Sequence, residues 1–337
     1  MIKFRHLVLV WGIYFLLAFP LFYFVYKYGD PGFGLKDFFD YYKLYENWDL
    51  ANVDAPFNMR LLSSFVVYLL NQTGLHYDTE IAFDSYNLNK QVFFNAVFFN
   101  FLCVASTCLL IFTTVRRYIH DILVSFVAGL LYLLGFGTIF FELMPITDAL
   151  SVLLFAWVFS TYLAKQYTIV FPLLLLILQR EYVFLALGLI ALIDLVKLKE
   201  RYYFHVLLIS VVSFAAYYVL RKTIFYTPTY DHQASPGYFL ESVTSLQFPL
   251  WPYIKQTMMT TNIFVLYLLL ILYKKGKSLT IDKLAFWKLL LLFVQINVIS
   301  FAAVFGNNTG RYFYILVPMV IFYLALEINP LLNAKRS

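Results

Sequence analysis

The 337-residue chain is 62% hydrophobic and only 13% charged, and its formal net charge is +6. Soluble domains carry about 25% charged residues, so this composition excludes an ordinary soluble enzyme. Apolar runs of about 20 residues, the length of a membrane-spanning helix, recur from end to end, whereas the strands of a β-barrel are shorter and alternate in polarity. We therefore predict an all-α, polytopic helical membrane protein with a single transmembrane domain over residues 1–337.

The chain begins with basic residues and an apolar run over 7–25. This run is longer than the core of a secretory signal peptide, and no small-residue cleavage site follows it, so we expect an uncleaved first span. Further spans are expected over 91–114, 122–141, 148–164, 167–179, 182–196, 203–220, 258–273, 284–304 and 311–328. The total is about ten transmembrane helices.

Basic residues gather between particular apolar runs and predict the orientation of the chain. The clusters contain Lys3 and Arg5, Arg116 and Arg117, Lys197 and Lys199, Lys274 and Lys275, and Lys335 and Arg336. The positive-inside rule places such clusters in the cytoplasm, which explains the net positive charge without nucleic-acid binding. With all five on that side, both termini are cytoplasmic, and we expect a multi-pass protein of a bacterial inner (plasma) membrane.

Two long polar segments then lie on the outer side, over 26–90 and 221–257. The first contains a short apolar stretch, 61–75, which polar residues interrupt. A full span here would move the Arg116 cluster to the outside, against the positive-inside rule. We therefore expect interfacial or re-entrant helices in the first outer segment.

Asp37 and Asp40 stand in an aromatic part of the first outer segment. On a helix, residues three apart share a face, so both carboxylates could point into a protein cavity while the neighbouring rings enter the lipid headgroups. A carboxylate in that place can act as a general base or bind a divalent cation. The alternative is a solvated loop whose aspartates cap a helix, and the spacing leaves both interpretations open.

Arg180 and Glu181 give a sharper signal, because they interrupt two apolar stretches. Charged residues in such places are costly and usually functional. We expect Arg180 to bind an anionic phosphate and Glu181 to orient the arginine side chain. The alternative is a simple ion pair between the two residues.

Asp148 and Glu142 flank Pro145 and indicate an acidic pocket, although an aspartate at a helix start also stabilises the helix.

Two more arginines are expected on the outer side. Arg311 opens the last apolar run, and Arg60 follows a Pro-Phe-Asn-Met sequence. A guanidinium group suits bidentate binding of phosphate oxygens. The alternative for each is an arginine that anchors a helix end at the membrane interface.

The sequence contains no convincing metal or nucleophile motif. The five histidines are scattered, and only His232, beside Asp231, is a candidate for a role. Neither a zinc spacing, nor a phosphate-binding glycine loop, nor a Ser–His–Asp pattern is evident. A divalent cation, Mg²⁺ or Mn²⁺, held by Asp37 and Asp40 stays open as a cofactor.

Four short motifs in order resemble the polytopic glycosyltransferases of the GT-C fold, in particular the small bacterial ones. They are an acidic outer segment that leads to Pro56-Phe57-Asn58-Met59-Arg60, the run Pro145-Ile146-Thr147-Asp148-Ala149-Leu150, the pair Arg180-Glu181, and Gly310-Arg311-Tyr312. Each motif alone is weakly specific, but their order and sidedness extend along almost the whole chain.

The resemblance implies transfer of a sugar from a polyprenyl-phosphate carrier to an acceptor on the outer (periplasmic or extracellular) face of the membrane. By this analogy Arg180, Arg311 and Arg60 bind the donor phosphate, and an aspartate of the first outer segment is the catalytic base. Asp40, which two tyrosines follow, is preferred to Asp37, although neither stands in the Asp-Glu pair of some family members.

Two other functions stay open. A non-catalytic subunit of a larger membrane assembly would use the aromatic segment 221–257 to dock on other membrane subunits. A lipid or solute transporter is the third choice, because transporters usually place charges near the bilayer midplane and often contain repeated halves. Here the expected charges gather at one face, and no repeat is evident.

Overall fold

The computed structural model describes residues 4–30, 37–54, 57–77, 88–225, 251, 254, 260–304 and 309–333 of the chain. Among these residues every regular element is a helix or a helical turn. In chain order they are α1 (Phe4–Tyr28), α2 (Asp37–Asn47), the 3-10 turn η1 (Phe57–Met59), α3 (Leu61–Gln72), α4 (Lys90–Tyr118), α5 (Ile122–Leu133), the π-helical turn η3 (Thr138–Glu142), α6 (Asp148–Leu163), the 3-10 turn η4 (Tyr167–Ile169), α7 (Val170–Ile177), α8 (Tyr182–Leu198), α9 (Arg201–Thr223), α13 (Asn262–Gly276), α14 (Lys283–Val304), α15 (Thr309–Tyr314) and α16 (Val317–Asn333).

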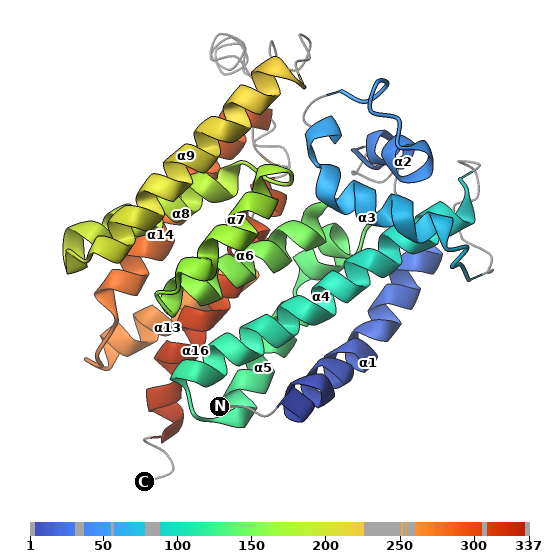
Figure 1. Cartoon of the computed structure of the whole chain (residues 1–337). Coiled ribbons are helices and arrows are strands. Elements are labelled where there is room, and N and C mark those ends of the chain that lie inside the picture. The colour runs from blue at the N-terminus through green and yellow to red at the C-terminus, as the bar shows by residue number, and fades with distance from the viewer. Residues whose placement is uncertain are drawn as a thin grey trace.

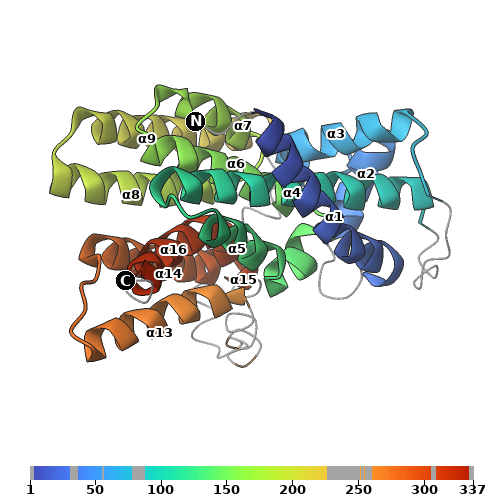
Figure 2. The ribbon, with the colours of Figure 1, turned by 90° about the horizontal axis from the view of Figure 1, so that it is seen from below.

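The helices form two layers, with α1 beside them (Figure 2). One layer contains α3, α4 and α6 to α9, with α2 packed on α3, and the other contains α5 and α13 to α16. The layers meet where α4 packs on α5 and α16 and where α6 packs on α16. Helix α4 therefore lies at the centre of the fold, and its two free cysteines, Cys103 and Cys108, are buried.

Within the described part of the chain, four helices are long and apolar enough to cross a membrane, namely α1, α4, α9 and the Lys283–Ser300 part of α14. Only about a quarter of the most apolar part of α1 and of α9 is buried inside the protein. Apolar side chains that face outward in this way suit a lipid environment. The structure therefore agrees with a helical membrane protein, whereas the expected number of about ten spans is not confirmed.

Several expected spans are shorter than predicted or interrupted. The run 122–141 is divided into α5 and η3, and the run 311–328 is divided between α15 and α16. Helices rise 1.5 Å per residue, so the 12 residues of α5 and the 16 of α6 extend only about 18 and 24 Å. Both helices are shorter than the hydrocarbon core of a membrane, which is about 30 Å thick. Hydropathy alone does not reveal how long the helices are.

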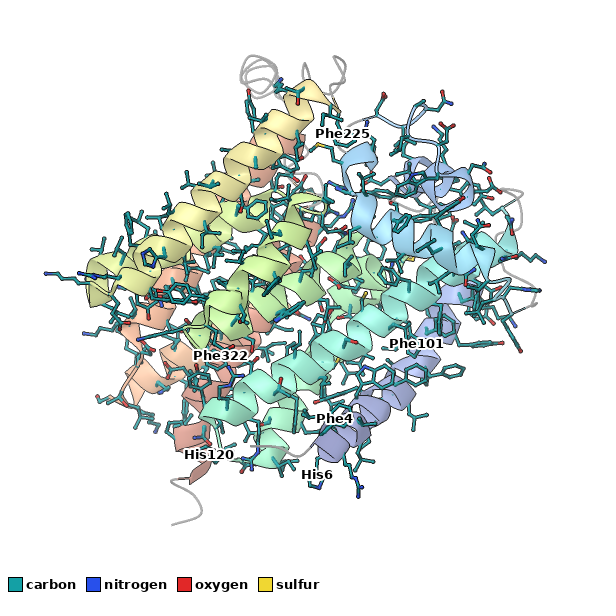
Figure 3. The ribbon with its side chains drawn as sticks, in the orientation of Figure 1. Phe4, His6, Phe101, His120, Phe225 and Phe322 are labelled. Carbon is teal, nitrogen blue, oxygen red and sulfur yellow. The ribbon has the colours of Figure 1, made fainter. Side chains whose placement is uncertain are left out.

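The start of α1, the end of α16 and the turns with basic clusters lie at one end of the molecule, and α2 and α3 lie at the other (Figure 1). Figure 3 shows His6 and His120 together at the first of these, which we call the basic end. There Tyr118 donates a hydrogen bond to the carbonyl of Leu163 at 2.7 Å and ties the end of α4 to that of α6. This grouping is what the positive-inside rule requires of clusters on one side of a membrane.

The basic end also holds buried ion pairs, where the sequence predicts only simple basic anchors. Asp194 of α8 accepts a hydrogen bond from Lys288 of α14 at 2.7 Å and another from Tyr162 of α6. Lys274 of α13 pairs with Glu327 of α16. These pairs join helices that are distant in sequence. Removing one partner of a buried pair costs about 3–5 kcal/mol of stability.

Helix α3 forms where the sequence predicts a helix over 61–75, and its Ser63, Ser64 and Asn71 face the protein. Asn71 donates to the carbonyl of Tyr45 in α2 at 2.7 Å and accepts from Asn95 of α4 at 2.7 Å. The Asn71 amide, which interrupts the apolar run, therefore connects α3 to two neighbours. Its position at the membrane interface stays a prediction.

Candidate functional site

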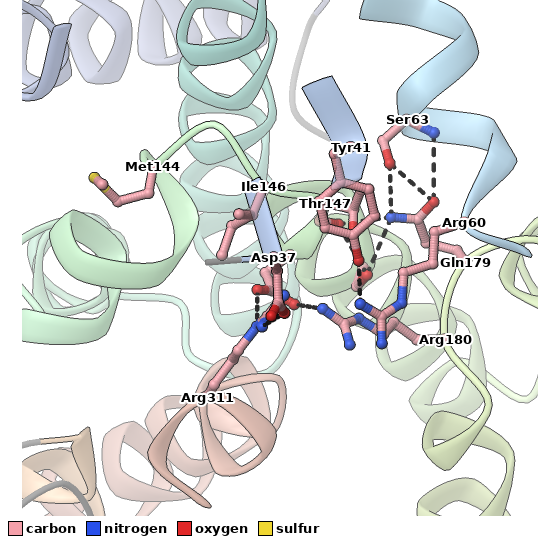
Figure 4. A network of polar contacts seen from close by, with 12 residues as sticks. Asp37, Tyr41, Arg60, Ser63, Met144, Ile146, Thr147, Gln179, Arg180 and Arg311 are labelled. Carbon is pink, nitrogen blue, oxygen red and sulfur yellow. Dashed lines mark hydrogen bonds and ion pairs between the residues drawn. The ribbon is translucent and has the colours of Figure 1, made fainter. Parts of the chain in front are cut away.

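Helix α2 directs two polar side chains into the protein at the end opposite the basic end. Its buried face consists of Phe38, Tyr41, Leu44 and Tyr45, which recur at the three- and four-residue spacing of an amphipathic helix. Asp37 is one turn before Tyr41, so the two share a side of the helix. Figure 4 shows both directed toward arginine side chains from other elements.

Asp148 is the centre of a chain of ion pairs. It is the first residue of α6, where free N–H groups and the helix dipole favour a carboxylate. Its Oδ1 accepts from Arg180 Nη2, and its Oδ2 accepts from Arg311 Nε. Arg311 Nη1 also pairs with Asp37 Oδ2. Charges therefore alternate through Asp37, Arg311, Asp148 and Arg180, which come from four separate parts of the chain. Figure 4 shows Asp37, Arg311 and Arg180 close together.

The turn that carries Arg180 is fixed by its neighbour Gln179, whose amide is buried. Its Nε2 donates to the carbonyl of Thr147 at 2.6 Å and to the hydroxyls of Ser63 and Ser151 at 3.1 and 3.3 Å. Its Oε1 lies 3.2 Å from the same Ser63 hydroxyl. One amide thus connects α3, α6 and the turn between α7 and α8, and holds Arg180 in place.

A second buried amide holds the backbone before Asp148. Asn100 of α4 donates to the carbonyl of Met144 and, at 2.8 Å, to that of Ile146. A lone asparagine in an apolar helix is costly unless it is satisfied, and here it fixes the segment between η3 and α6. Asn100 is not among the predicted site residues, although its polarity inside an apolar run was the available signal.

Arg60, the residue just before α3, is a buried cation with an unusual set of partners. Its Nη1 donates to the hydroxyl of Tyr41, and its guanidinium lies 5.8 and 5.7 Å from the ring centres of Tyr41 and Phe57. These distances are within the range of cation–π attraction. Among the described residues no carboxylate forms an ion pair with Arg60.

Each of the three arginines keeps a buried nitrogen without a hydrogen-bond partner among the described residues. These atoms are Arg60 Nε, Arg180 Nε and Arg311 Nη2. A buried unsatisfied donor costs about 1–3 kcal/mol. Two carboxylates, Asp37 and Asp148, form hydrogen-bonded ion pairs with two of these guanidinium groups, and the charge of Glu181 also acts on Arg60. The cluster therefore offers free guanidinium donors, which suit an anion such as phosphate.

The two aspartates of α2 have different environments, although they are three residues apart. Asp37 enters the ion-pair chain and its side chain is 28% exposed. The side chain of Asp40 is 36% exposed, and its Oδ1 lies 3.6 Å from Lys43 Nζ. Asp40 does not take part in the chain of ion pairs. The sequence favours Asp40 as the base, but the structure places Asp37 beside the arginines.

The pKa values of the two carboxyls move in opposite directions. Burial raises the pKa of Asp37, but the charge and hydrogen bond of Arg311, with the charges of Arg60 and Arg180, outweigh burial and hold that pKa below its ordinary value. Burial raises the pKa of Asp40, and the opposing effect of Lys43 is too small to reverse it. Asp37 is therefore ionised at neutral pH. Its ion pair contributes stability above the unfolded pKa of about 3.9 and loses it as the pH falls through the still lower folded value.

Two supporting acids have roles other than those expected. The sequence predicts that Glu181 orients Arg180, whereas Asp148 is the partner in the structure, and Glu181 forms no ion pair with any described residue. Glu142, which is buried, accepts a hydrogen bond from Tyr132 at 2.9 Å and does not bond to the ion-pair chain. Of the two acids expected to form a pocket around Pro145, only Asp148 pairs with the arginines.

The arrangement does not suit a metal held by Asp37 and Asp40. Their carboxylates face Arg311 and Lys43, which are cations rather than co-ligands. The described part of the chain contains no group of three His, Cys, Asp or Glu side chains that could hold a metal ion. We therefore derive no step through a divalent cation.

His232, Asp231 and most of the segment 221–257 lie outside the described residues. No protein-family model, curated protein or solved structure matches the chain. The function must therefore be argued from the geometry of the cluster itself.

Proposed function

We propose that the chain is a membrane glycosyltransferase that transfers a sugar from a polyprenyl-phosphate-linked donor to an acceptor on the outer face of the membrane. The observation that carries the proposal is the set of three buried arginines with unfilled donors beside the ionised carboxylate of Asp37. A phosphate fits such donors, and its attraction to them is strong in a low-dielectric site. The apolar helices suit a donor with a hydrocarbon tail, and the resemblance to GT-C proteins implies the same reaction.

In this mechanism an acceptor hydroxyl oxygen attacks the anomeric carbon of the sugar. The bond from that carbon to the phosphate oxygen breaks, and the lipid phosphate leaves with the electron pair. Asp37 accepts the hydroxyl proton as general base. Arg60, Arg180 and Arg311 stabilise the charge that grows on the phosphate as the bond breaks. The configuration at the anomeric carbon is inverted.

Binding of the donor and use of Asp37 are linked through Arg311. A phosphate that accepts from Arg311 competes with the carboxylate of Asp37 for the same guanidinium. The exchange releases Asp37 from the interaction that holds its pKa down. The donor therefore makes the base more basic at the moment when it is needed.

The binding part of the proposal can be tested with farnesyl phosphate as a short lipid-phosphate probe and farnesol as its uncharged control. Purified protein should bind farnesyl phosphate much more tightly than farnesol. Replacing Arg60 with Met should weaken binding about 10- to 100-fold, because it removes charge-assisted hydrogen bonds worth about 1.5–3 kcal/mol. Arg117→Met, at the basic end, is the matched control and should bind as the wild type does. Equal binding of the two probes would refute the phosphate site.

The catalytic part needs a transfer assay. Liposomes that contain the protein should release polyprenyl phosphate from a panel of radiolabelled polyprenyl-phosphate sugars, in the presence of sugar or lipid acceptors. Binding of the phosphate probe without transfer from any donor, together with a partner that purifies in fixed ratio, would instead favour the non-catalytic subunit.

The pH dependence of transfer distinguishes the two candidate bases. The value of kcat/KM reports the free enzyme, so with Asp37 as base its acid limb should lie below the ordinary aspartate pKa of 3.8. With Asp40 the limb should lie above that value. If donor phosphate takes Arg311 from Asp37, the acid limb of kcat should also lie at a higher pH than that of kcat/KM. Rates measured from about pH 3 to 8 would check both statements.

A further inference from the structure

The short helix α15 carries Arg311 but has only six residues. Isolated helices of this length are unstable, so tertiary contacts must set their position. Tyr314, one turn after Arg311, is buried and lies against the chain between α5 and η3. Figure 2 shows α15 and α5 in the same layer. The contacts of Tyr314 therefore bear directly on where Arg311 points.

Two glycines make room for the ring of Tyr314. A Cβ added at Gly137 would lie 2.2 and 2.3 Å from two ring carbons of Tyr314, and one added at Gly135 would lie 2.2 Å from its hydroxyl oxygen. Real Cβ atoms essentially never make contacts this short. The neighbours of a ring held in a packed core can shift only a little. The Gly-Phe-Gly sequence thus forms a slot that only residues without a Cβ can provide.

The hydroxyl of Tyr314 is fixed at the end of this slot. It lies 2.6 Å from Thr138 Oγ1 and donates to the carbonyl of Tyr132 at 3.3 Å. The hydroxyl of Tyr132 in turn donates to Glu142 at 2.9 Å. The π-helical turn that supplies Thr138 and Glu142 therefore completes the slot. This gives a role to Glu142 and η3, which the ion-pair chain does not use.

We propose that Gly135, Gly137 and Thr138 form a slot for Tyr314 that positions Arg311 for the donor phosphate. Tyr314 is thus a positioning residue, since it does not touch the phosphate and acts through Arg311. The inference rests on the proposed function insofar as Arg311 binds phosphate. A displacement of about 1 Å can cost about 100-fold in a site of this kind, so small changes in the slot should have large effects.

The test compares glycine substitutions that differ in what the added Cβ meets. Gly137→Ala and Gly135→Ala should weaken farnesyl phosphate binding about 10- to 100-fold. Gly188→Ala on α8 is the matched control, since its Cβ would meet nothing closer than 3.8 Å, and it should bind as the wild type does. Tyr314→Phe keeps the ring but loses its hydrogen bonds, so it should fold and weaken binding by about tenfold or less.

Two measurements separate positioning from a general loss of structure. In the background of Arg311→Ala, the Gly137→Ala substitution should weaken binding by less than about twofold, because two changes that act through one group are not additive. Hydrogen exchange of peptides over 309–314 should rise in Gly137→Ala and stay unchanged in Gly188→Ala. Unchanged exchange, or an undiminished effect of Gly137→Ala without Arg311, would refute the slot. Failure of the wild type to bind farnesyl phosphate, with the exchange result obtained, would refute the proposed function and leave the slot intact.

Discussion

Replacing Asp37 with asparagine should reduce sugar transfer about 100- to 10,000-fold, which is the usual contribution of a general base. The same variant should bind farnesyl phosphate at least as tightly as the wild type does. In the wild type the phosphate must displace the carboxylate of Asp37 from Arg311, whereas a neutral amide competes weakly. Transfer rates and probe affinities, measured on the same preparations, would show the loss of kcat without a loss of donor binding.

Asp40→Asn is the matched control, because Asp40 lies on the same helix, and its nearest charged partner is the partly exposed Lys43. It should retain most of the activity. If Asp40→Asn abolishes transfer and Asp37→Asn does not, then Asp40 is the base, as the sequence favours. Weakened probe binding in Asp37→Asn would instead indicate that the carboxylate orders the site rather than competing with the phosphate.

Replacing Asp148 with alanine should destabilise the protein by about 3–5 kcal/mol. The substitution leaves Arg180 without its carboxylate and removes one of the two carboxylates that Arg311 contacts. Breaking a buried pair is costly because an uncompensated charge stays in the interior. Chemical unfolding in detergent would measure the change, and Asp54→Ala, at an exposed acid, should change stability by less than about 0.5 kcal/mol.

The double variant Asp148→Leu/Arg180→Met identifies the cause of that loss. It removes both charges of one pair and keeps Arg311 with Asp37, so it should recover a large part of the stability of the wild type. Its binding of farnesyl phosphate should still be weak, since one phosphate ligand is missing. A double variant as unstable as Asp148→Ala would show that packing of the Asp148 side chain, rather than charge, is what matters.

Much of the site could be predicted because charges in an apolar sequence are conspicuous. Arg180 was predicted from the cost of placing charge among apolar residues, and Asp37 from its helical spacing to Asp40. Asp148 and Arg311 were predicted from their places at the start of apolar runs. The structure joins these four residues through ion pairs. A helix with Asp37 and Asp40 on one face was one of two interpretations of that segment, and the structure contains this helix as α2. The sequence could not decide between Asp37 and Asp40, because that choice depends on how α2 is rotated against α15.

The remaining features depend on contacts that hydropathy does not describe. The break between α5 and η3 is made by glycines that accept a ring from α15, nearly 180 residues later in the chain. In the sequence, Gln179 is a polar residue beside Arg180 with no evident role of its own. In the structure, its amide connects three elements. The pair of Asp194 and Lys288 lies inside runs that we interpreted as plain spans. In each case the partner is distant in sequence, so periodicity gives no indication of it.

The bond from Asn100 to the carbonyl of Ile146 also gives the level of the site along α4. Asn100 is ten residues after Lys90, where α4 begins, so at 1.5 Å per residue it lies about 15 Å along the helix from that residue. The backbone next to Asp148 is held at the same level. The cluster is therefore anchored partway along α4 rather than at its end. In the transferase that we propose, a lipid-linked donor would reach this level by sideways diffusion within its leaflet, whereas a water-soluble acceptor would have to enter from the end that carries α2 and α3.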